Sequence, residues 1–168
     1  MTENTIQDKA ESSKAKAGKF LTFKLGEEVY GLEILKVQEI IGIMKVTAVP
    51  GTPSFIRGVI NLRGKIIPVV DLRLKFSMEK KEDTEKSCII VVQIQLRTKK
   101  LIMGIVVDEV SEVLNIIQDQ IEDPPSFGSA VDTAFIMGMG KVGQKVIMLL
   151  DIDKVLSAGD LETVSSMA

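Results

Sequence analysis

The fold is decided by residues 55–72, which read Phe-Ile-Arg-Gly-Val-Ile-Asn-Leu-Arg-Gly-Lys-Ile-Ile-Pro-Val-Val-Asp-Leu. The pattern returns at residues 135–152 as Phe-Ile-Met-Gly-Met-Gly-Lys-Val-Gly-Gln-Lys-Val-Ile-Met-Leu-Leu-Asp-Ile. The opening Phe-Ile-x-Gly and the closing Asp both align at a shift of 80 residues (135 − 55 and 151 − 71). Because apolar and turn positions recur together, the chain builds the same backbone unit twice.

A second repeated stretch precedes each of these segments. Residues 31–40 read Gly-Leu-Glu-Ile-Leu-Lys-Val-Gln-Glu-Ile, and they correspond to residues 104–113, Gly-Ile-Val-Val-Asp-Glu-Val-Ser-Glu-Val, at a shift of 73 (104 − 31). The two copies differ at one basic turn, which is Asn-Leu-Arg-Gly at 61–64 in the first copy. Val-Gly-Gln occupies the corresponding region at 142–144 in the second copy, with no arginine. We therefore expect function to lie at the turn that carries Arg63.

Short apolar runs separated by turn residues predict an all-β fold, a barrel or sandwich, with about five strands per copy. The expected strands lie at 20–25, 29–32, 46–50, 55–60, 65–70, 88–95 and 100–107, with a last hairpin from 134 to 150. Apolar residues also recur at helical spacing, and we expect short helical turns there: Ile34, Val37, Ile40 and Ile41 in the first copy, and Val107, Val110, Val113 and Leu114 in the second. Asp71 and Asp151 follow the closing strands, where each is expected to cap a short helix.

The changes in composition along the chain predict its domain organisation. We expect a flexible tail at 1–18, a first β-barrel subdomain at 19–76, a charged linker at 77–87, a second β-barrel subdomain at 88–156 and a polar C-terminal tail at 157–168. A unit of about 65–70 residues has a marginal core by itself. We therefore expect the two subdomains to pack on each other, with room for strands to be exchanged between them.

Composition excludes several classes of function. A net charge of −2 with mixed signs argues against nucleic-acid binding. The absence of histidine removes the common zinc and copper sites and the Ser-His and Cys-His nucleophile pairs. Cys88 is the only cysteine, which fits a reducing cytoplasm. No apolar run of about 18 residues is present, so no membrane insertion is expected. We expect no catalytic residues, no metal and no cofactor.

Four segments together resemble the CheW family of bacterial chemotaxis adaptors. They are Val-Gln-Glu-Ile at 37–40, Pro-Ser-Phe-Ile-Arg-Gly-Val-Ile-Asn-Leu-Arg-Gly at 53–64, Pro-Val-Val-Asp-Leu-Arg at 68–73 and the stretch at 104–113 quoted above. The resemblance covers about residues 19–157, and it implies two SH3-like five-stranded barrels packed around a shared apolar core, with short helices and no catalytic activity.

The resemblance also implies partners and a place in the cell. Such proteins link the cytoplasmic tips of methyl-accepting chemoreceptors to the histidine kinase CheA, whose regulatory domain they bind barrel to barrel. Other CheW-like domains are further candidate partners. The chain is then expected to be cytoplasmic and recruited to membrane-associated receptor arrays.

Eight residues are the expected partner-binding set: Arg63, Glu39, Val37, Gly58, Ile40, Asn61, Val110 and Val113. The resemblance places Arg63 and Glu39 at positions associated with receptor or kinase binding, and it places Val110 and Val113 in a receptor-facing region. By chemistry alone, Arg63 suits a carboxylate or a helix C-terminus on a partner. Glu39 has a counterpart in Glu112, so it is either a structural residue or a partner contact, and it is also placed to pair with Arg63.

Three other functions are to be weighed against the adaptor. A small-molecule-binding barrel is disfavoured because one Tyr, six Phe and no Trp supply few aromatic walls. An enzyme is disfavoured because no nucleophile motif is present. A fragment of a longer CheA- or CheV-type chain is the alternative within the family, and the two polar ends favour a free-standing adaptor instead.

Overall fold

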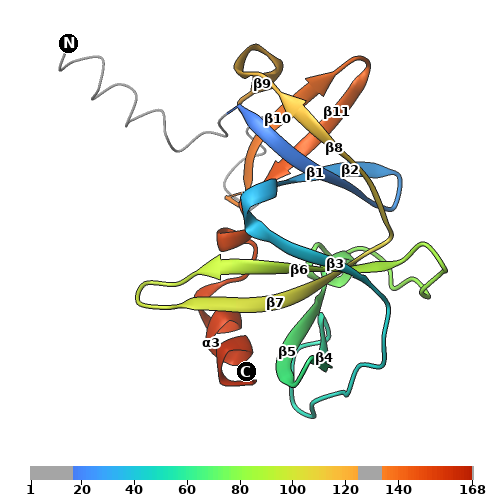
Figure 1. The fold of residues 1–168 in the computed structure, drawn as a ribbon, viewed down its shortest axis with the longest axis vertical. Helices are drawn as coiled ribbons and strands as arrows, with labels where there is room; N and C mark the ends of the chain where they lie inside the picture. The colour runs from blue at the N-terminus through green and yellow to red at the C-terminus, as the bar shows by residue number, and fades with distance from the viewer. Residues whose placement is uncertain (1–16, 125–133, 168) are drawn as a thin grey trace.

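The computed structural model describes residues 17–124 and 134–167, and its strands form two sheets (Figure 1). The strands are β1 (Gly18–Leu25), β2 (Glu28–Glu33), β3 (Val37–Gly42), β4 (Ile56–Leu62), β5 (Lys65–Asp71), β6 (Cys88–Gln95), β7 (Lys100–Val107), β8 (Glu109–Ile116), β9 (Ile121–Glu122), β10 (Ile136–Val142) and β11 (Lys145–Leu150). The helices are α2 (Leu72–Lys75) and α3 (Ala158–Met167), with the short 3-10 turns η1 (Ile34–Lys36), η2 (Gln118–Gln120) and η3 (Ile152–Lys154). The tail expected at 1–18 lies outside the described residues except for its last two.

The two sheets are the two barrels expected from the sequence. The first barrel has the strand order β3-β6-β7-β5-β4, and the second has the order β8-β1-β2-β11-β10-β9. Figure 1 shows the second barrel above the first along the long axis of the molecule. Strands are exchanged between the halves of the chain, because β1 and β2 pair in the second barrel while β6 and β7 pair in the first.

A large apolar cluster lies between the barrels, and each barrel also holds a small cluster of its own. The buried part of the shared cluster draws on both sheets and on the C-terminal elements; it includes Leu21, Phe23, Leu32, Val70, Ile90, Met103, Ile105, Leu150, Ile152 and Val164. Beside it, four aromatic rings form a row in the order Phe23, Tyr30, Phe76 and Phe135, with centroids 5.8, 5.8 and 4.8 Å apart. The barrels are therefore packed around one shared core.

Of the residues expected in helical turns, only Ile34 lies in one, the 3-10 turn η1; the others lie in strands. In β3 the half-buried residues Val37, Glu39 and Ile41 alternate with exposed ones, which is the two-residue period of a strand. The equivalent stretch of the second copy forms β8, which pairs with β1. In so short a segment, apolar residues three or four positions apart fit both the 3.6-residue period of a helix and the two-residue period of a strand. The β-branched residues and the neighbouring strands decide in favour of sheet.

The two aspartates that we expected to be caps are caps. The Asp71 side chain accepts hydrogen bonds from the backbone N–H groups of Arg73 (3.0 Å) and Leu74 (3.4 Å) at the start of α2. The Asp151 side chain accepts from the N–H of Asp153 (3.0 Å) at the start of η3. Each aspartate thus closes one copy of the repeat, which leaves no reason to group them as a catalytic pair.

The segment expected to be a polar tail at 157–168 forms α3 over most of its length. Ser157 and Asp160 cap the helix reciprocally, since the backbone N–H of each donates to the side chain of the other at 3.1 Å. Lys75 Nζ donates to Asp160 Oδ2 at 2.6 Å, and Val164 is fully buried in the shared core. In the described ranges, no helix has both the length and the apolarity that a membrane crossing requires.

Replacing Asp160 with Asn tests how α3 is held. Burial alone raises the pKa of the Asp160 carboxyl, but hydrogen bonds from Lys75 and Ser157 outweigh it and hold the pKa below the ordinary value of 3.8. A carboxyl with a lowered pKa stabilises the fold above that ordinary value, and the contribution is lost as the pH falls through the folded pKa. We expect Asp160→Asn to lower the free energy of unfolding by about 1 kcal/mol at neutral pH. In urea titrations the difference in unfolding free energy between wild type and Asp160→Asn should shrink as the pH falls below the ordinary value and vanish below the folded pKa. A difference that persists there would contradict this account.

Candidate functional site

The turn between β4 and β5 holds an arginine in an unusual backbone conformation. Arg63 has φ = 51° and Gly64 has φ = 88°, the left-handed pair typical of a two-residue type I′ hairpin. Asn61 Oδ1 accepts a hydrogen bond from the Gly64 N–H at 2.9 Å and orders the turn. In the second copy the position equivalent to Arg63 is Gly143, with φ = 62°. The first copy therefore carries a long basic side chain where the backbone favours glycine.

The Arg63 side chain points outward and forms a two-point ion pair with Glu39 on β3. Arg63 Nη1 donates to Glu39 Oε2 at 3.3 Å, and Arg63 Nη2 donates to Glu39 Oε1 at closer range. The arginine side chain remains 69% exposed, and its hydrogen bonds to the Glu39 carboxylate raise the pKa of its guanidinium. Exposed ion pairs add little to stability. This one orients the guanidinium; it confirms the outward direction expected from the sequence and shows the pairing that the sequence left open.

The second copy shows that the fold does not need this pair. Glu112 is the counterpart of Glu39, and in the described part of the chain its carboxylate has no ion-pair partner; only its backbone is engaged, by the Thr22 hydroxyl. Because Gly143 stands where Arg63 would be, the second barrel folds without a charged turn. The pairing of Glu39 therefore results from the presence of Arg63.

The four apolar residues of the expected set form two equivalent pairs. Val37 and Val110 are partly buried against the shared core, whereas Ile40 and Val113 are 44% and 48% exposed. Glu39, Arg63 and Asn61 make up what we call the arginine surface. Ile40 follows Glu39 on β3, so its side chain lies on the opposite face of that strand. Val113 lies on β8 of the second barrel, opposite Leu21 of β1. The structure thus brings three expected residues together and places Ile40 and Val113 elsewhere.

Gly58 has a packing role. Its φ is +140°, and a Cβ built on it would lie 2.0 Å from the carbonyl oxygen of Thr47. Thr47 exchanges two backbone hydrogen bonds with Val59, at 2.8 and 2.9 Å, so the chain at 47–48 is held directly against β4. Only Thr47 of the strand expected at 46–50 makes a strand-like pairing. Gly58 is buried and supports the barrel wall behind the arginine surface.

Arg57 also differs between the copies, but it is used within the protein. Its guanidinium donates to Asp71 Oδ2 at 3.0 and 3.1 Å and to both oxygens of Asp83 at 2.8 and 2.9 Å. These hydrogen bonds tie the charged linker to the first barrel. Those that Arg57 donates to Asp83 lower the pKa of the Asp83 carboxyl. The sequence did not show this contact. Its only signal was Met137, which stands at the equivalent position of the second copy.

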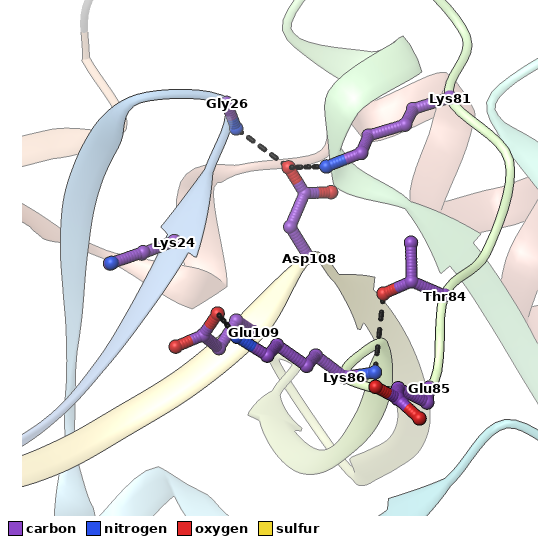
Figure 2. Close-up of a pocket in the computed structure, with 8 residues that line it drawn as sticks. All are labelled: Lys24, Gly26, Lys81, Thr84, Glu85, Lys86, Asp108 and Glu109. Atoms are coloured by element: carbon purple, nitrogen blue, oxygen red, sulfur yellow. Dashed lines mark hydrogen bonds and ion pairs between the residues drawn. The ribbon is translucent and has the colours of Figure 1, made fainter.

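A second ionic contact missed from the sequence lies where the chain passes from β7 to β8. Asp108 Oδ2 accepts hydrogen bonds from the Gly26 N–H and from Arg73 Nη1, both at 2.7 Å, and Lys81 Nζ lies 3.8 Å away. Figure 2 shows Asp108 reaching between Gly26 and Lys81, beside the Lys86–Glu109 ion pair. The cavity here has a volume of about 330 Å³ and mixes both signs of charge. These contacts join the linker and the two barrels.

The described residues contain no cluster of three or more acidic, Cys or His side chains placed to hold a metal ion. The charged groups just described are mostly paired with one another.

Known proteins share this architecture. The family model of the CheW-like domain matches residues 19–160. The chain is 43% identical to the chemotaxis protein CheW of Klebsiella aerogenes over 149 residues, which cover 89% of this chain and 87% of that protein. It is 30% identical to the chemotaxis protein CheW of Treponema pallidum, over 88% and 86% of the two chains. The crystal structure of the scaffolding protein TtCheW from Thermoanaerobacter tengcongensis matches with a TM-score of 0.75 and 40% identity, covering 86% of this chain and 95% of that one.

Alanine substitutions at two glycines near the turn test whether Gly58 is needed for packing. We expect Gly58→Ala to cost about 2–3 kcal/mol of unfolding free energy, because the methyl group would overlap the Thr47 carbonyl. Gly64→Ala is the matched control: a Cβ there meets nothing within 4 Å, so only the left-handed φ costs energy, about 1 kcal/mol. Urea unfolding followed by circular dichroism measures both. Equal stability of the two variants would contradict the packing role, and we expect Gly58→Asp to destabilise the fold at least as much as Gly58→Ala.

Proposed function

The chain belongs to the CheW-like family, and we propose that it is a non-enzymatic adaptor that couples the cytoplasmic tips of chemoreceptors to the histidine kinase CheA in signalling arrays. Its relatives named above are chemotaxis and scaffolding proteins. The absence of histidine and the lack of a nucleophile motif agree with a role in binding.

The observation that carries the proposal is the geometry of Arg63. A guanidinium has five N–H donors, and Glu39 occupies only part of them, so the others face solvent. Glu39 holds the planar group in one orientation, which reduces the entropy lost when a partner binds. The exposed donors suit a carboxylate or the free carbonyl groups at a helix C-terminus. A residue that only kept the hairpin in solution would not need this ordered geometry.

We assign the arginine surface and the β8 face to different contacts. The arginine surface presents the Arg63–Glu39 pair, and the exposed Ile40 lies on the other face of the same strand. On the second barrel, the exposed Val113 and the half-buried Val110 are placed to meet an apolar stripe of a receptor helix. The CheA regulatory domain and receptor tips are the proposed partners, and other CheW-like domains are further ones. Such an adaptor works in the cytoplasm and is recruited to membrane-associated arrays.

Substitutions at Arg63 test the proposal in a reconstituted assay of kinase activity with receptors, CheA and this protein. Arg63→Glu should fold normally yet lose receptor-dependent kinase control, because it reverses the charge offered to the partner and repels Glu39. Arg63→Gly copies the second hairpin, so its thermal unfolding midpoint should equal or exceed that of wild type while kinase control falls.

Lys145→Glu is the matched control, since it changes the charge equally beside the corresponding turn of the second barrel. Normal kinase control by both Arg63 variants, at wild-type protein levels, would remove Arg63 from the binding site. A loss of control that is as large in Lys145→Glu would indicate a general effect of charge.

A further inference from the structure

The parallel ladder between β5 and β7 in the first barrel is short. It joins only Val69, Val70 and Asp71 of β5 to residues 104–106 of β7. In the second barrel the equivalent ladder between β11 and β2 has four pairs and starts two positions earlier, at Ile147. Residues 65–68 and 100–103 of the first barrel therefore lie beside each other without strand pairing, and the two strands splay apart there.

Pro68 explains why this ladder stops. Val59, the residue opposite Pro68 on β4, uses its own backbone N–H and C=O to bond Thr47 on its other side. In an antiparallel pair, two residues opposite each other either bond each other or both turn their backbone groups away. Because Val59 bonds Thr47, Pro68 also turns its backbone N and O away from β4, toward β7. Proline has no N–H to donate, so the pairing is lost at this position. Met148, which has an N–H, occupies the equivalent place in the second barrel and pairs with Tyr30.

The splayed strands leave an open gap with a volume of about 490 Å³, lined by residues of β5, β7 and α3. Its apolar lining includes Leu101 and Ile102, and the side chain of Ile66 is 49% exposed at its mouth. Figure 1 shows α3 in the angle between β7 and β5. Alternate residues of both strand segments direct their backbone groups into this gap. It therefore offers two free strand edges beside an apolar surface.

The rim of the gap is basic. It carries Lys65, Lys99 and Lys100, all exposed, and no carboxylate lines it. In the described ranges, none of the three lysines has an acidic side chain within ion-pair distance. This is uncommon in a chain with a net charge of −2, whose other ionic clusters pair internally. Such a rim complements an acidic ligand.

The equivalent ladder of the second barrel leaves a shorter strand edge free. β2 extends only one residue beyond its ladder, whereas β7 extends four, from Lys100 to Met103. At the shift of 73 residues, Glu27 and Glu28 occupy the places of Lys100 and Leu101. The free edge, the apolar lining and the lysines thus occur together in one copy only.

We propose that this gap binds an extended acidic peptide segment of a partner protein, which adds as a strand to the free edge of β7 or β5. Main-chain hydrogen bonds supply the pairing, the lysines contact alternate carboxylates, and apolar side chains between them pack on Ile66 and Ile102. The site adjoins the arginine surface, because Ile66 pairs with Asn61, but it uses different residues and does not depend on the proposed adaptor function.

The test uses the full chain and a peptide of sequence Gly-Ser-Glu-Val-Glu-Val-Glu-Val-Gly-Ser, blocked at both ends. We expect binding in fluorescence anisotropy, with amide NMR shifts and slowed hydrogen exchange at 66–67 and 100–103. Replacing Lys99 and Lys100 together with Glu should weaken binding by about tenfold or more, whereas Lys145→Glu should change it by less than about twofold. A peptide with N-methylated valines has the same charge but fewer main-chain donors, and it should bind about tenfold more weakly.

Several outcomes would overturn the proposal. They are equal binding of a peptide with Lys in place of Glu, NMR shifts outside the gap, and insensitivity to the lysine double substitution. Vesicles containing phosphatidylglycerol that compete through the same lysines, without slowed exchange at 100–103, would assign the rim to a lipid surface instead. The double substitution of Lys99 and Lys100 should leave receptor-dependent kinase control at its wild-type level, so that this site and the adaptor function can fail independently.

Discussion

The apolar cluster shared by the two barrels is the constraint on which the rest of the structure depends. Neither half of the sequence completes a barrel by itself, because β1 and β2 pair in the second barrel and β6 and β7 in the first. A side chain such as Phe23 or Ile105 loses its contact with water only when both barrels are formed. Each such burial contributes roughly 1.5–3 kcal/mol. The chain crosses between the barrels at Asp108, and the hydrogen bonds from Gly26 and Arg73 hold that crossing in place.

Duplication of the backbone leaves one copy free to diverge at individual positions. Arg63 replaces a glycine at a turn that accepts either residue at some conformational cost, and Pro68 replaces a residue that could have donated to a ladder. Both changes disfavour regular structure locally, yet the shared core maintains the fold around them. Both also lie on the first barrel, in or beside the β4–β5 hairpin. The second barrel, which retains Gly143 and Met148, shows the same architecture without these features.

Part of the candidate site could be predicted from residues alone. The exposure of Arg63 followed from its turn position and was confirmed. Its pairing with Glu39 was one of the alternatives left open, and the structure shows that pairing. The packing role of Gly58 could not be predicted, because the overlapping carbonyl belongs to Thr47, which precedes it by a loop. The Arg57–Asp83 ion pair was missed for a similar reason: it joins a strand to a charged linker whose path no local pattern indicates.

The sequence by itself determined the duplication, the β class, the hairpin turns and the aspartate caps, since each of these depends on a few neighbouring residues and on backbone preferences. Only the tertiary structure decided which strands pair, that residues 37–42 and 109–116 are strands, and that residues 158–167 form a helix. Short apolar segments satisfy more than one period, so the partner that buries them selects the conformation. The same holds for α3, whose mostly polar sequence becomes a helix because Val164 reaches the shared core and Lys75 holds Asp160.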